Sequence, residues 1–385
     1  MTNLNDDHTM RICIITSTPF PPGKHNGIAN YVLNTANKLV ERGHSVTIIT
    51  RGSFTKTASE IVNNVEIVRP PFIYIYPFHV HVHGLFVKKC IEALGNRFDI
   101  VHVHSPLSPP IKLFLPLVST IHSSLLGDAQ NMEVVDVKSL ATKLQAWSVG
   151  HRLISELIKN SDLVTTVSNA VSYELRKYYA GNIQPVVIGN GVDERSFIPA
   201  EPQNTGNYVL YVGRLTYKKG LFDLLKCATL LRMTNISFVL AGEGELYAKL
   251  RKQVRDIGLQ DRIRFEGHVN TKDLIRLYQN ASVFVFPSYY EGLPTAILEA
   301  MSVGLPVVAT HVGGIRDVIK DGENGISIPP GAPERMAEAI SVLIQDRELR
   351  KELGRNARRT IEESYTWDRV TDRLENCYSS LSAFK

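Results

Sequence analysis

The sequence predicts an α/β fold made of two doubly wound halves, in which mostly parallel sheets are covered by helices on both faces. Apolar runs of strand length alternate with helical stretches along nearly the whole chain. This alternation starts at Arg11 and starts afresh at Tyr208, and the stretch between the halves, residues 197–207, is rich in Pro, Asn and Gly. Strands that alternate with helices are typical of a parallel sheet.

The first half opens with the apolar run Arg11–Thr16, which predicts a buried strand. A loop rich in Pro and Gly follows, and then a helix over Ala29–Arg42 that Gly43 ends. The next expected strand is Ser45–Thr50. Further expected strands are Val65–Val68, Ile100–His104, Leu117–Ile121, Leu163–Val167 and Val186–Ile188, and the longest helical stretch is Ser139–Lys159.

The second half repeats this plan. Its expected strands are Tyr208–Val212, Ile236–Ala241, Ile263–Glu266, Val283–Phe286 and Val307–Ala309, and its expected helices are Leu221–Leu231, Glu245–Ile257, Lys272–Gln279 and the stretch after Thr295. We expect a first domain of residues 10–196, a linker of 197–207, a second domain of 208–366, and a helix, 367–381, that packs back on the first domain. Ligands of such sheets bind beyond the carboxyl ends of the strands, so the loops that follow strands should carry the function.

The composition is that of an ordinary globular protein of about two domains. Of its 385 residues, 44% are hydrophobic and 21% are charged, and the net charge of +5 is too small to indicate nucleic acid as a partner. No apolar run is long enough for a membrane-spanning helix, and the polar residues 1–10 do not resemble a signal peptide. Four scattered cysteines without a C-x-x-C pair favour free thiols, so we expect a cytoplasmic protein.

The segment PSYYEGLPTAILEAMSVG, residues 287–304, is the most informative part of the chain. It places Glu291 and Glu299 eight positions apart, around a tight turn that follows a strand and leads into a helix near Thr295. An uncapped helix start presents backbone N–H groups to an anion, and carboxylates accept hydrogen bonds from hydroxyl groups. The segment therefore predicts a site for a phosphate that is joined to a sugar.

Two cations lie on another loop at the same predicted edge. Arg214 and Lys219 follow the strand Tyr208–Val212 and are five positions apart, which is close enough for both to contact one anion. Arginine offers a planar fork to phosphate and lysine a point charge. The alternative interpretation is a pair of solvated surface cations, and the nearby Glu291 turn favours the phosphate site.

These motifs resemble those of a known family. The segments GRLTYKKG, AGEGE, FEGHV and VGGIRDVI, together with the segment around Glu291, are similar to group 1 (family 4) retaining glycosyltransferases of the GT-B fold. In the first half, DIVHVHSP, TIHSS, VTTVSNA and GNGVD agree, so the resemblance covers Met10 to Leu381. It implies two Rossmann-like domains that face each other across a cleft, the first binding the acceptor and the second a nucleotide-sugar donor.

The resemblance implies a role for individual residues. Arg214 and Lys219 match the pair that neutralises the donor pyrophosphate, Glu291 the residue that holds sugar hydroxyls, and Glu299 the residue that holds the ribose. The remaining implied donor contacts are the Gly292, Leu293, Pro294 and Thr295 turn, the base contact Val269, the loop residues Asn26 and Gly27, and His122, which faces the donor sugar near the reaction centre. Gly242 and Gly244 form a weak dinucleotide-like pattern that we interpret as a loop lining the donor site.

The sequence departs from the family pattern at four positions. Asn26 stands where the family carries the first of two glycines, and Leu293-Pro294 replaces Phe-Gly. Asp317 replaces a glutamate, and Gly189 replaces a proline. None of these changes removes a charged donor contact, but the altered turn leaves the identity of the sugar open.

The spacing of the glutamates excludes one mechanism. Retaining glycoside hydrolases need two carboxylates about 5–5.5 Å apart, whereas eight helical residues span about 12 Å. Glu291 and Glu299 are therefore interpreted as binding groups. The chain has no Asp-x-Asp metal signature, so we expect no metal cofactor, with cations and a helix terminus stabilising the leaving group. Retention by front-face attack is the mechanism that the family implies.

Two features outside these motifs have alternative interpretations. His79, His81 and His83 alternate as if on one strand face, where a metal site is the minor alternative. The aromatic and basic segment 72–89 is interpreted as an ordinary part of the first domain that shapes the acceptor side, with peripheral docking at the inner face of a membrane as the alternative.

The function expected from these observations is retaining transfer of a hexosyl or N-acetylhexosaminyl group. The expected donor is a nucleoside-diphosphate sugar, with UDP as the nucleotide. The expected acceptor is a hydroxyl of a glycan, a lipid-linked compound or a small molecule. The alternatives are a sugar-nucleotide epimerase or a phosphorylase of the same fold, and a non-catalytic subunit that binds nucleotide sugars.

Overall fold

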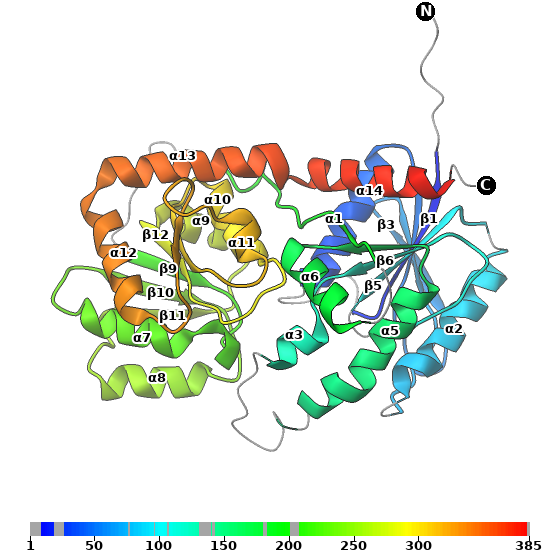
Figure 1. Cartoon of the computed structure of the whole chain (residues 1–385), viewed down its shortest axis with the longest axis horizontal. Coiled ribbons are helices and arrows are strands. Elements are labelled where there is room, and N and C mark those ends of the chain that lie inside the picture. The colour runs from blue at the N-terminus through cyan, green and yellow to red at the C-terminus, as the bar shows by residue number, and fades with distance from the viewer. Residues whose placement is uncertain are drawn as a thin grey trace, which may run out of the picture.

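A computed structural model describes residues 9–18, 27–75, 78–95, 97–105, 108–130, 140, 143–179, 183–200 and 208–382. The chain forms two α/β halves, each built on its own sheet (Figure 1). The first half contains β1 (Arg11–Thr16), α1 (Gly27–Glu41), β2 (Ser45–Ile49), β3 (Ala58–Val62), β4 (Val65–Arg69), α2 (His79–Ala93), β5 (Ile100–Ser105), β6 (Leu117–Ile121), α3 (Leu125–Gln130), the π-helical η1 (Ala146–Gly150), α5 (His151–Asn160), β7 (Leu163–Thr166), α6 (Asn169–Tyr178) and β8 (Val186–Val187).

The second half and the C-terminal helices follow the same alternation. They contain β9 (Tyr208–Val212), the 3₁₀ turn η2 (Tyr217–Lys219), α7 (Leu221–Leu230), β10 (Ser237–Ala241), α8 (Tyr247–Asp256), β11 (Ile263–Gly267), α9 (Thr271–Asn280), β12 (Val283–Phe286), α10 (Thr295–Ser302), β13 (Val307–Thr310), α11 (Ile315–Val318), β14 (Ile326–Ile328), α12 (Pro333–Gln345), α13 (Arg347–Ser364) and α14 (Trp367–Ser382).

Both sheets have the doubly wound topology that the sequence predicts. The strand order of the second sheet is β11-β10-β9-β12-β13-β14, and all its pairs are parallel. The order therefore reverses between β9 and β12, which is where ligands bind in folds of this kind. The first sheet has the order β3-β4-β2-β1-β5-β6-β7-β8, and its order reverses between β1 and β5.

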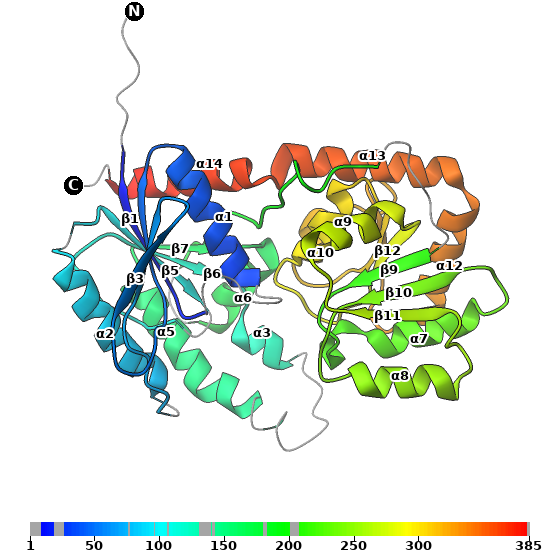
Figure 2. The same ribbon diagram turned by 180° about the vertical axis from the view of Figure 1, so that it is seen from behind.

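The two C-terminal helices connect the halves. Seen from opposite sides, α13 runs along the second half and α14 along the first (Figures 1 and 2). Val370, Leu374 and Tyr378 of α14 belong to the buried cluster that lies between the first sheet and α1. The chain passes from the first half to the second near Val192 and returns near Thr366. These two residues form a parallel bridge, so the two connecting segments run side by side.

One expectation about local structure was wrong, and one strand was missed. The segment with His79, His81 and His83 is the start of helix α2 and not a strand, because its buried positions Val80, Val87 and Ile91 follow helical spacing. Histidines at every second position over only five residues are compatible with the period of a strand and with that of a helix. The edge strand β3, which is antiparallel to β4, was not expected.

Three other predictions depend partly on residues outside the described ones. Residues 201–207 of the expected linker, Asn26, and residues 139, 141 and 142 of the expected long helix are not among them. Within the described part of the chain, no helix is both long and apolar enough to cross a membrane.

Candidate active site

Most of the predicted site residues of the second half lie at one edge of its sheet. Arg214 and Lys219 follow β9, Gly242 and Gly244 follow β10, Val269 follows β11, and Gly292, Leu293, Pro294 and Thr295 follow β12. Because all these strands are parallel, their carboxyl ends share this edge. The loops after β9 and β12 flank the point at which the strand order reverses, and they bring Lys219 together with Glu291.

Backbone contacts hold these two loops against each other. Gly220 adopts a left-handed φ of 64°, and a Cβ there would overlap the carbonyl oxygen of Pro287, so a glycine is needed at this position. The amide of Tyr289 donates a hydrogen bond of 2.8 Å to the carbonyl oxygen of Lys218. In the same way, a Cβ at Gly242 would overlap the carbonyl oxygen of Gly213, so the loops after β9 and β10 also pack backbone to backbone.

Lys219 and Glu291 form a buried ion pair at this position. The Nζ of Lys219 donates to Oε1 of Glu291, and each side chain is only 10% exposed. Ser288 donates a second hydrogen bond to the same oxygen at 2.7 Å. The ammonium group of Lys219 also lies 4.9 Å from the ring centre of Phe286. The sequence signal for this extra partner is a serine three positions before Glu291.

The electrostatics of the pair keep Glu291 ionised. Burial opposes the charge of Glu291, but Lys219, Lys218 and the hydrogen bonds from Lys219 and Ser288 outweigh it, so the pKa of Glu291 lies below its ordinary value. Burial lowers the pKa of Lys219, although Glu291 acts in the opposite direction. The charge of Arg214 lowers the pKa of Lys219 further, which places the exposed Arg214 close to the pair.

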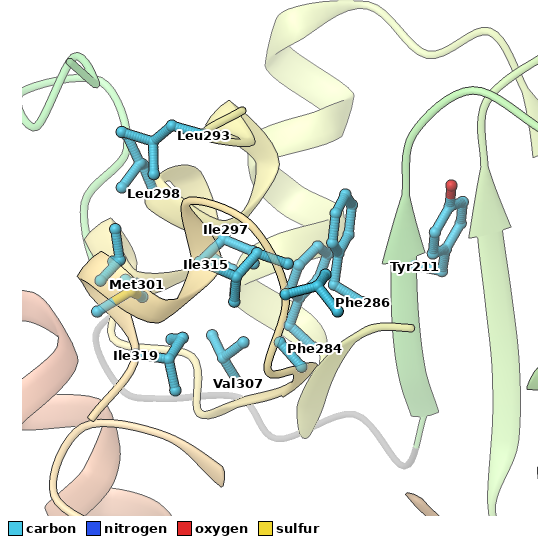
Figure 3. Packing of buried hydrophobic residues seen from close by; sticks show 14 of the residues in the cluster. Tyr211, Phe284, Phe286, Leu293, Ile297, Leu298, Met301, Val307, Ile315 and Ile319 are labelled. Carbon is cyan, nitrogen blue, oxygen red and sulfur yellow. The ribbon is translucent and has the colours of Figure 1, made fainter. Parts of the chain in front are cut away.

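Helix α10 begins at Thr295 without a side-chain cap, as predicted. The N-cap residue Pro294 is extended and makes no capping hydrogen bond, so the first N–H groups of the helix remain available to an anion. Asn190, from the first half of the chain, donates to the carbonyl oxygen of Leu293 at 2.7 Å. Figure 3 shows Ile297 and Met301 among the buried side chains that hold α10 on the sheet.

Glu299 has a partner of its own. The hydroxyl of Tyr278, on α9, donates to Oε2 of Glu299 at 2.8 Å. Burial raises the pKa of Glu299, while this hydrogen bond acts to lower it. The two glutamates of the motif thus have separate partners, Lys219 and Tyr278. Sequence reasoning missed Tyr278, because it lies on a different helix.

His122 contributes from the first half. It follows β6 directly, and its backbone carbonyl is so close to Gly292 that a Cβ on that glycine would overlap the oxygen. The Nε2 of His122 lies 3.0 Å from Nδ1 of His104 on β5. Burial lowers the pKa of His122 to about 3, so its ring is neutral at pH 7. His122 therefore meets the turn after β12.

Further contacts join the two halves around this point, and sequence reasoning did not predict them. Lys218 pairs with Asp128 at 2.8 Å, and the hydroxyl of Tyr290 donates to Glu174 at 2.7 Å. Asp317, which replaces the usual glutamate, accepts a hydrogen bond of 2.6 Å from the amide of Asn169 at the start of α6. The halves are therefore in direct contact beside the predicted donor site.

The first-domain loop is only partly placed. Gly27 is the first residue of α1, whereas Asn26 lies outside the described residues. Val269 is partly buried and follows the end of β11.

Taken together, two cations, an uncapped helix start and two oriented carboxylates can bind a diphosphate that carries hydroxyl-bearing groups.

The comparisons with known proteins agree with a two-domain sugar-transferring enzyme. The fold matches sucrose-phosphate synthase from Thermosynechococcus elongatus with a TM-score of 0.83 at 22% identity, covering 98% of this chain and 100% of that one. It also matches HepE of Anabaena in complex with UDP-glucose, with a TM-score of 0.74 at 18% identity over 96% of this chain and 100% of that one. These likenesses show the GT-B fold.

The sequence comparisons identify the family. The model for glycosyl transferases group 1 matches residues 192–360, and the model for glycosyltransferase family 4 matches residues 25–196. An uncharacterized glycosyltransferase of Methanocaldococcus jannaschii is 29% identical over 96% of this chain and 98% of its own length. The protein belongs to the group 1 glycosyltransferases and is an enzyme of that class.

Proposed function

We propose that the protein is a retaining glycosyltransferase that moves a hexosyl or N-acetylhexosaminyl group from a nucleoside-diphosphate sugar to a hydroxyl group. The observation that carries this proposal is the position of Arg214 and of the Lys219–Glu291 pair beside the uncapped start of α10, at the point where the strand order reverses. A UDP-sugar is the proposed donor, and the likeness to HepE, which was solved with UDP-glucose, supports it.

In the proposed reaction, the donor diphosphate lies between Arg214 and the first turn of α10. Glu291 holds sugar hydroxyls, Glu299 holds the ribose, and His122 faces the sugar from the first half. The acceptor oxygen forms a bond to the anomeric carbon on the face from which the phosphate departs, and the bond from that carbon to the phosphate oxygen breaks. The acceptor proton passes to the departing phosphate oxygen, and the nucleoside diphosphate leaves.

The charge that develops on the leaving phosphate needs stabilisation. We propose that Arg214, Lys219 and the N-terminus of α10 supply it in place of a divalent metal. Residues 208–366 would then form the donor domain, and residues 10–196 the acceptor domain. A sugar-nucleotide epimerase, a phosphorylase or a non-catalytic subunit would use the same donor contacts, and the test must separate these alternatives.

Replacement of Arg214 tests the proposal. Arg214→Ala should lower transfer from the UDP-sugar about 10²–10³-fold, the usual loss for one charge-stabilising donor, while the protein stays folded. The matched control is Arg335→Ala, since Arg335 is exposed on α12 and pairs with Glu338. Product mass spectrometry with soluble and lipid-linked acceptors is the measurement. Unchanged turnover in Arg214→Ala would overturn the assignment, and UDP binding without any transfer would favour a non-catalytic subunit.

A further inference from the structure

A cluster of basic side chains lies in the first half, apart from the donor contacts. We call Arg51, Phe72, His79 and His83 the basic cluster. Three of these side chains surround the ring of Phe72. Its ring centre lies 5.2 Å from the guanidinium carbon of Arg51, 5.2 Å from the ring centre of His83 and 6.2 Å from that of His79. Arg51 follows β2, and the other three residues follow β4. The cluster therefore gathers side chains from the loops after two neighbouring strands of the first sheet and from the first turns of α2, which carries His79 and His83.

Some side-chain nitrogen atoms of two cluster residues, Arg51 and His83, are buried without a hydrogen-bond partner among the described residues. Nε of Arg51 is buried without a partner among the described residues, and so are both ring nitrogens of His83, a side chain with 0% exposure. Buried polar groups are nearly always hydrogen-bonded, and each exception needs an explanation. The neutral ring of His83 has one N–H donor, and the nearby carbonyl of Pro71 is not in hydrogen-bonding geometry with it. This N–H and the Nε–H of Arg51 indicate that the protein keeps two donors in place for a group that arrives later.

The charge of the cluster is not balanced either. Within the described part of the chain, no carboxylate forms an ion pair with Arg51, and burial lowers its pKa. Burial and the charge of Arg51 lower the pKa of His83 to about 4, although the carbonyl of Pro71 acts in the opposite direction. The acidic residue of α5 that reaches α2, Glu156, pairs instead with the exposed His81 at 3.8 Å. A cation would be repelled here, and an anion attracted.

The loop that carries Arg51 is held rigidly. The amide of Gly52 donates to the carbonyl oxygen of Pro70 at 2.9 Å, and the amide of Phe72 donates to that of Ser53 at 3.0 Å. A Cβ at Gly52 would lie 2.6 Å from the carbonyl oxygen of Arg69, so the close approach of the two segments requires glycine. The Arg51 side chain is therefore presented from a fixed backbone and loses little freedom on binding.

The cluster also lies at the functional edge of its sheet. Strands β2, β1, β5 and β6 are parallel, so Arg51 after β2 and His122 after β6 lie at the same edge. In the proposed reaction, His122 faces the donor sugar, and the acceptor approaches from the first half. An anionic group at Arg51 would hold an acceptor on the His122 side of the molecule.

We propose that the basic cluster binds an oxyanion, a phosphate or a carboxylate, that belongs to the acceptor. Arg51 supplies a planar fork for two of its oxygens, and His83 supplies a buried N–H behind it. The inference rests on the proposed function, because it is the glycosyl acceptor that would carry the anion. A soluble sugar phosphate and a lipid with an anionic headgroup offer the same chemistry, and the test separates these two sources.

The test compares Arg51→Gln with a matched control, Arg97→Gln. Arg97 is also stacked on a phenylalanine, with its guanidinium carbon 5.7 Å from the ring centre of Phe98, but it has a carboxylate partner in Glu66. Each full-length protein is saturated with UDP and titrated with inorganic phosphate, glucose 6-phosphate and glucose. Sedimentation with vesicles of phosphatidylinositol or phosphatidylcholine tests the lipid source. A separate titration of each protein with UDP reads the donor site alone.

In the expected result, Arg51→Gln weakens binding of phosphate and of glucose 6-phosphate, or of phosphatidylinositol vesicles, by about tenfold or more. That is the loss expected for a charge-assisted hydrogen bond. Arg97→Gln binds the anionic compounds as the wild type does, and the affinity for UDP is unchanged in every variant. Arg51→Lys, which keeps the charge, loses less of the anion binding than Arg51→Gln. Equal anion binding by Arg51→Gln and wild type, or no preference for the anionic compounds over glucose and phosphatidylcholine, would overturn the inference. Failure of wild type to bind UDP would instead contradict the proposed function.

Discussion

The Nδ1 atom of His104 lies 3.0 Å from the Nε2 atom of His122, and both rings contact the ring of Tyr31. Burial keeps both imidazoles neutral by lowering their pKa, so each ring carries one N–H. Nε2 of His104 is buried and has no partner among the described residues. Orphaned buried N–H groups are rarer than orphaned acceptors. We infer that His104 carries its proton on Nδ1 and donates it to His122, which leaves the Nδ1–H of His122 to act as a donor.

His104→Phe tests this relationship, because phenylalanine keeps a ring beside His102 and removes the hydrogen bond. Loss of a neutral hydrogen bond is worth about 1 kcal/mol, so we expect kcat to fall about fivefold while UDP affinity stays unchanged. Nitrogen-15 NMR of the histidine rings should show His122 protonated on Nδ1 in the wild type and a mixture of tautomers in the variant. Protonation of wild-type His122 on Nε2 would contradict the inference.

The Lys219–Glu291 ion pair should be costly to break from one side only. Glu291→Gln or Lys219→Met leaves a buried charge without its partner, and the free energy of unfolding should fall by about 3–5 kcal/mol. The double variant removes both charges and should recover much of that stability, but none of the transfer activity. Denaturant unfolding and a transfer assay on the same samples are the measurements. A double variant no more stable than either single one would show that the pair does not balance charge in this way.

Tyr278 should act on the nucleotide through Glu299. Tyr278→Phe removes the 2.8 Å hydrogen bond that orients this carboxylate and helps to keep its pKa down. We expect the Kd for UDP to rise about fivefold, equivalent to about 1 kcal/mol. Tyr208→Phe is the matched control, since the Tyr208 hydroxyl donates to the backbone carbonyl of Leu277 at 2.7 Å. Calorimetric titration with UDP should separate the two variants, and equal Kd values would argue against an orienting role.

Stability should fall in acid because of the buried His102 and His104 and the half-buried His122. Burial lowers the pKa of His102 and of His122 to about 3, and that of His104 lies well below 6.5. The unfolded chain therefore binds more protons than the folded one below about pH 6.5. Their contribution to stability is complete above that pH and is lost as the pH falls toward 3, by up to about 1.4 kcal/mol per pH unit for each ring. Melting temperatures that stay constant between pH 7 and 4.5 would contradict this prediction.

The strand, turn and helix around Glu291 could be predicted from the sequence, because their signals are local. The apolar run Val283–Phe286 and the proline at 294 fix where β12 ends and where α10 begins, and the structure follows both. The cations after β9 could be assigned to the same edge because parallel strands share it. Local pattern and sheet topology were thus sufficient to bring Lys219 and Glu291 together.

The residues that orient these groups could not be predicted in the same way. Tyr278 reaches Glu299 across 21 positions, and His104 reaches His122 across 18, through packing that no local pattern records. The prediction of a strand at the start of α2 was wrong for a different reason. A few alternating histidines suggested a strand, whereas the spacing of buried residues over the whole helix sets the structure. Side-chain partners thus depend on tertiary packing even where the elements do not.

Gly292 should control how closely the two halves approach. A Cβ at this position would overlap the backbone carbonyl oxygen of His122, and a backbone atom cannot rotate away as a side chain can. Gly292→Ala should therefore separate the halves slightly at the point where the donor sugar is proposed to bind. A displacement of about 1 Å near the reacting groups can lower a rate about 100-fold. UDP affinity should change much less, because the cations and Glu299 that are proposed to contact the nucleotide lie on the second half alone. Transfer kinetics and UDP titration on the same variant check both expectations, and wild-type turnover would mean that the contact between Gly292 and His122 is not part of the reacting state.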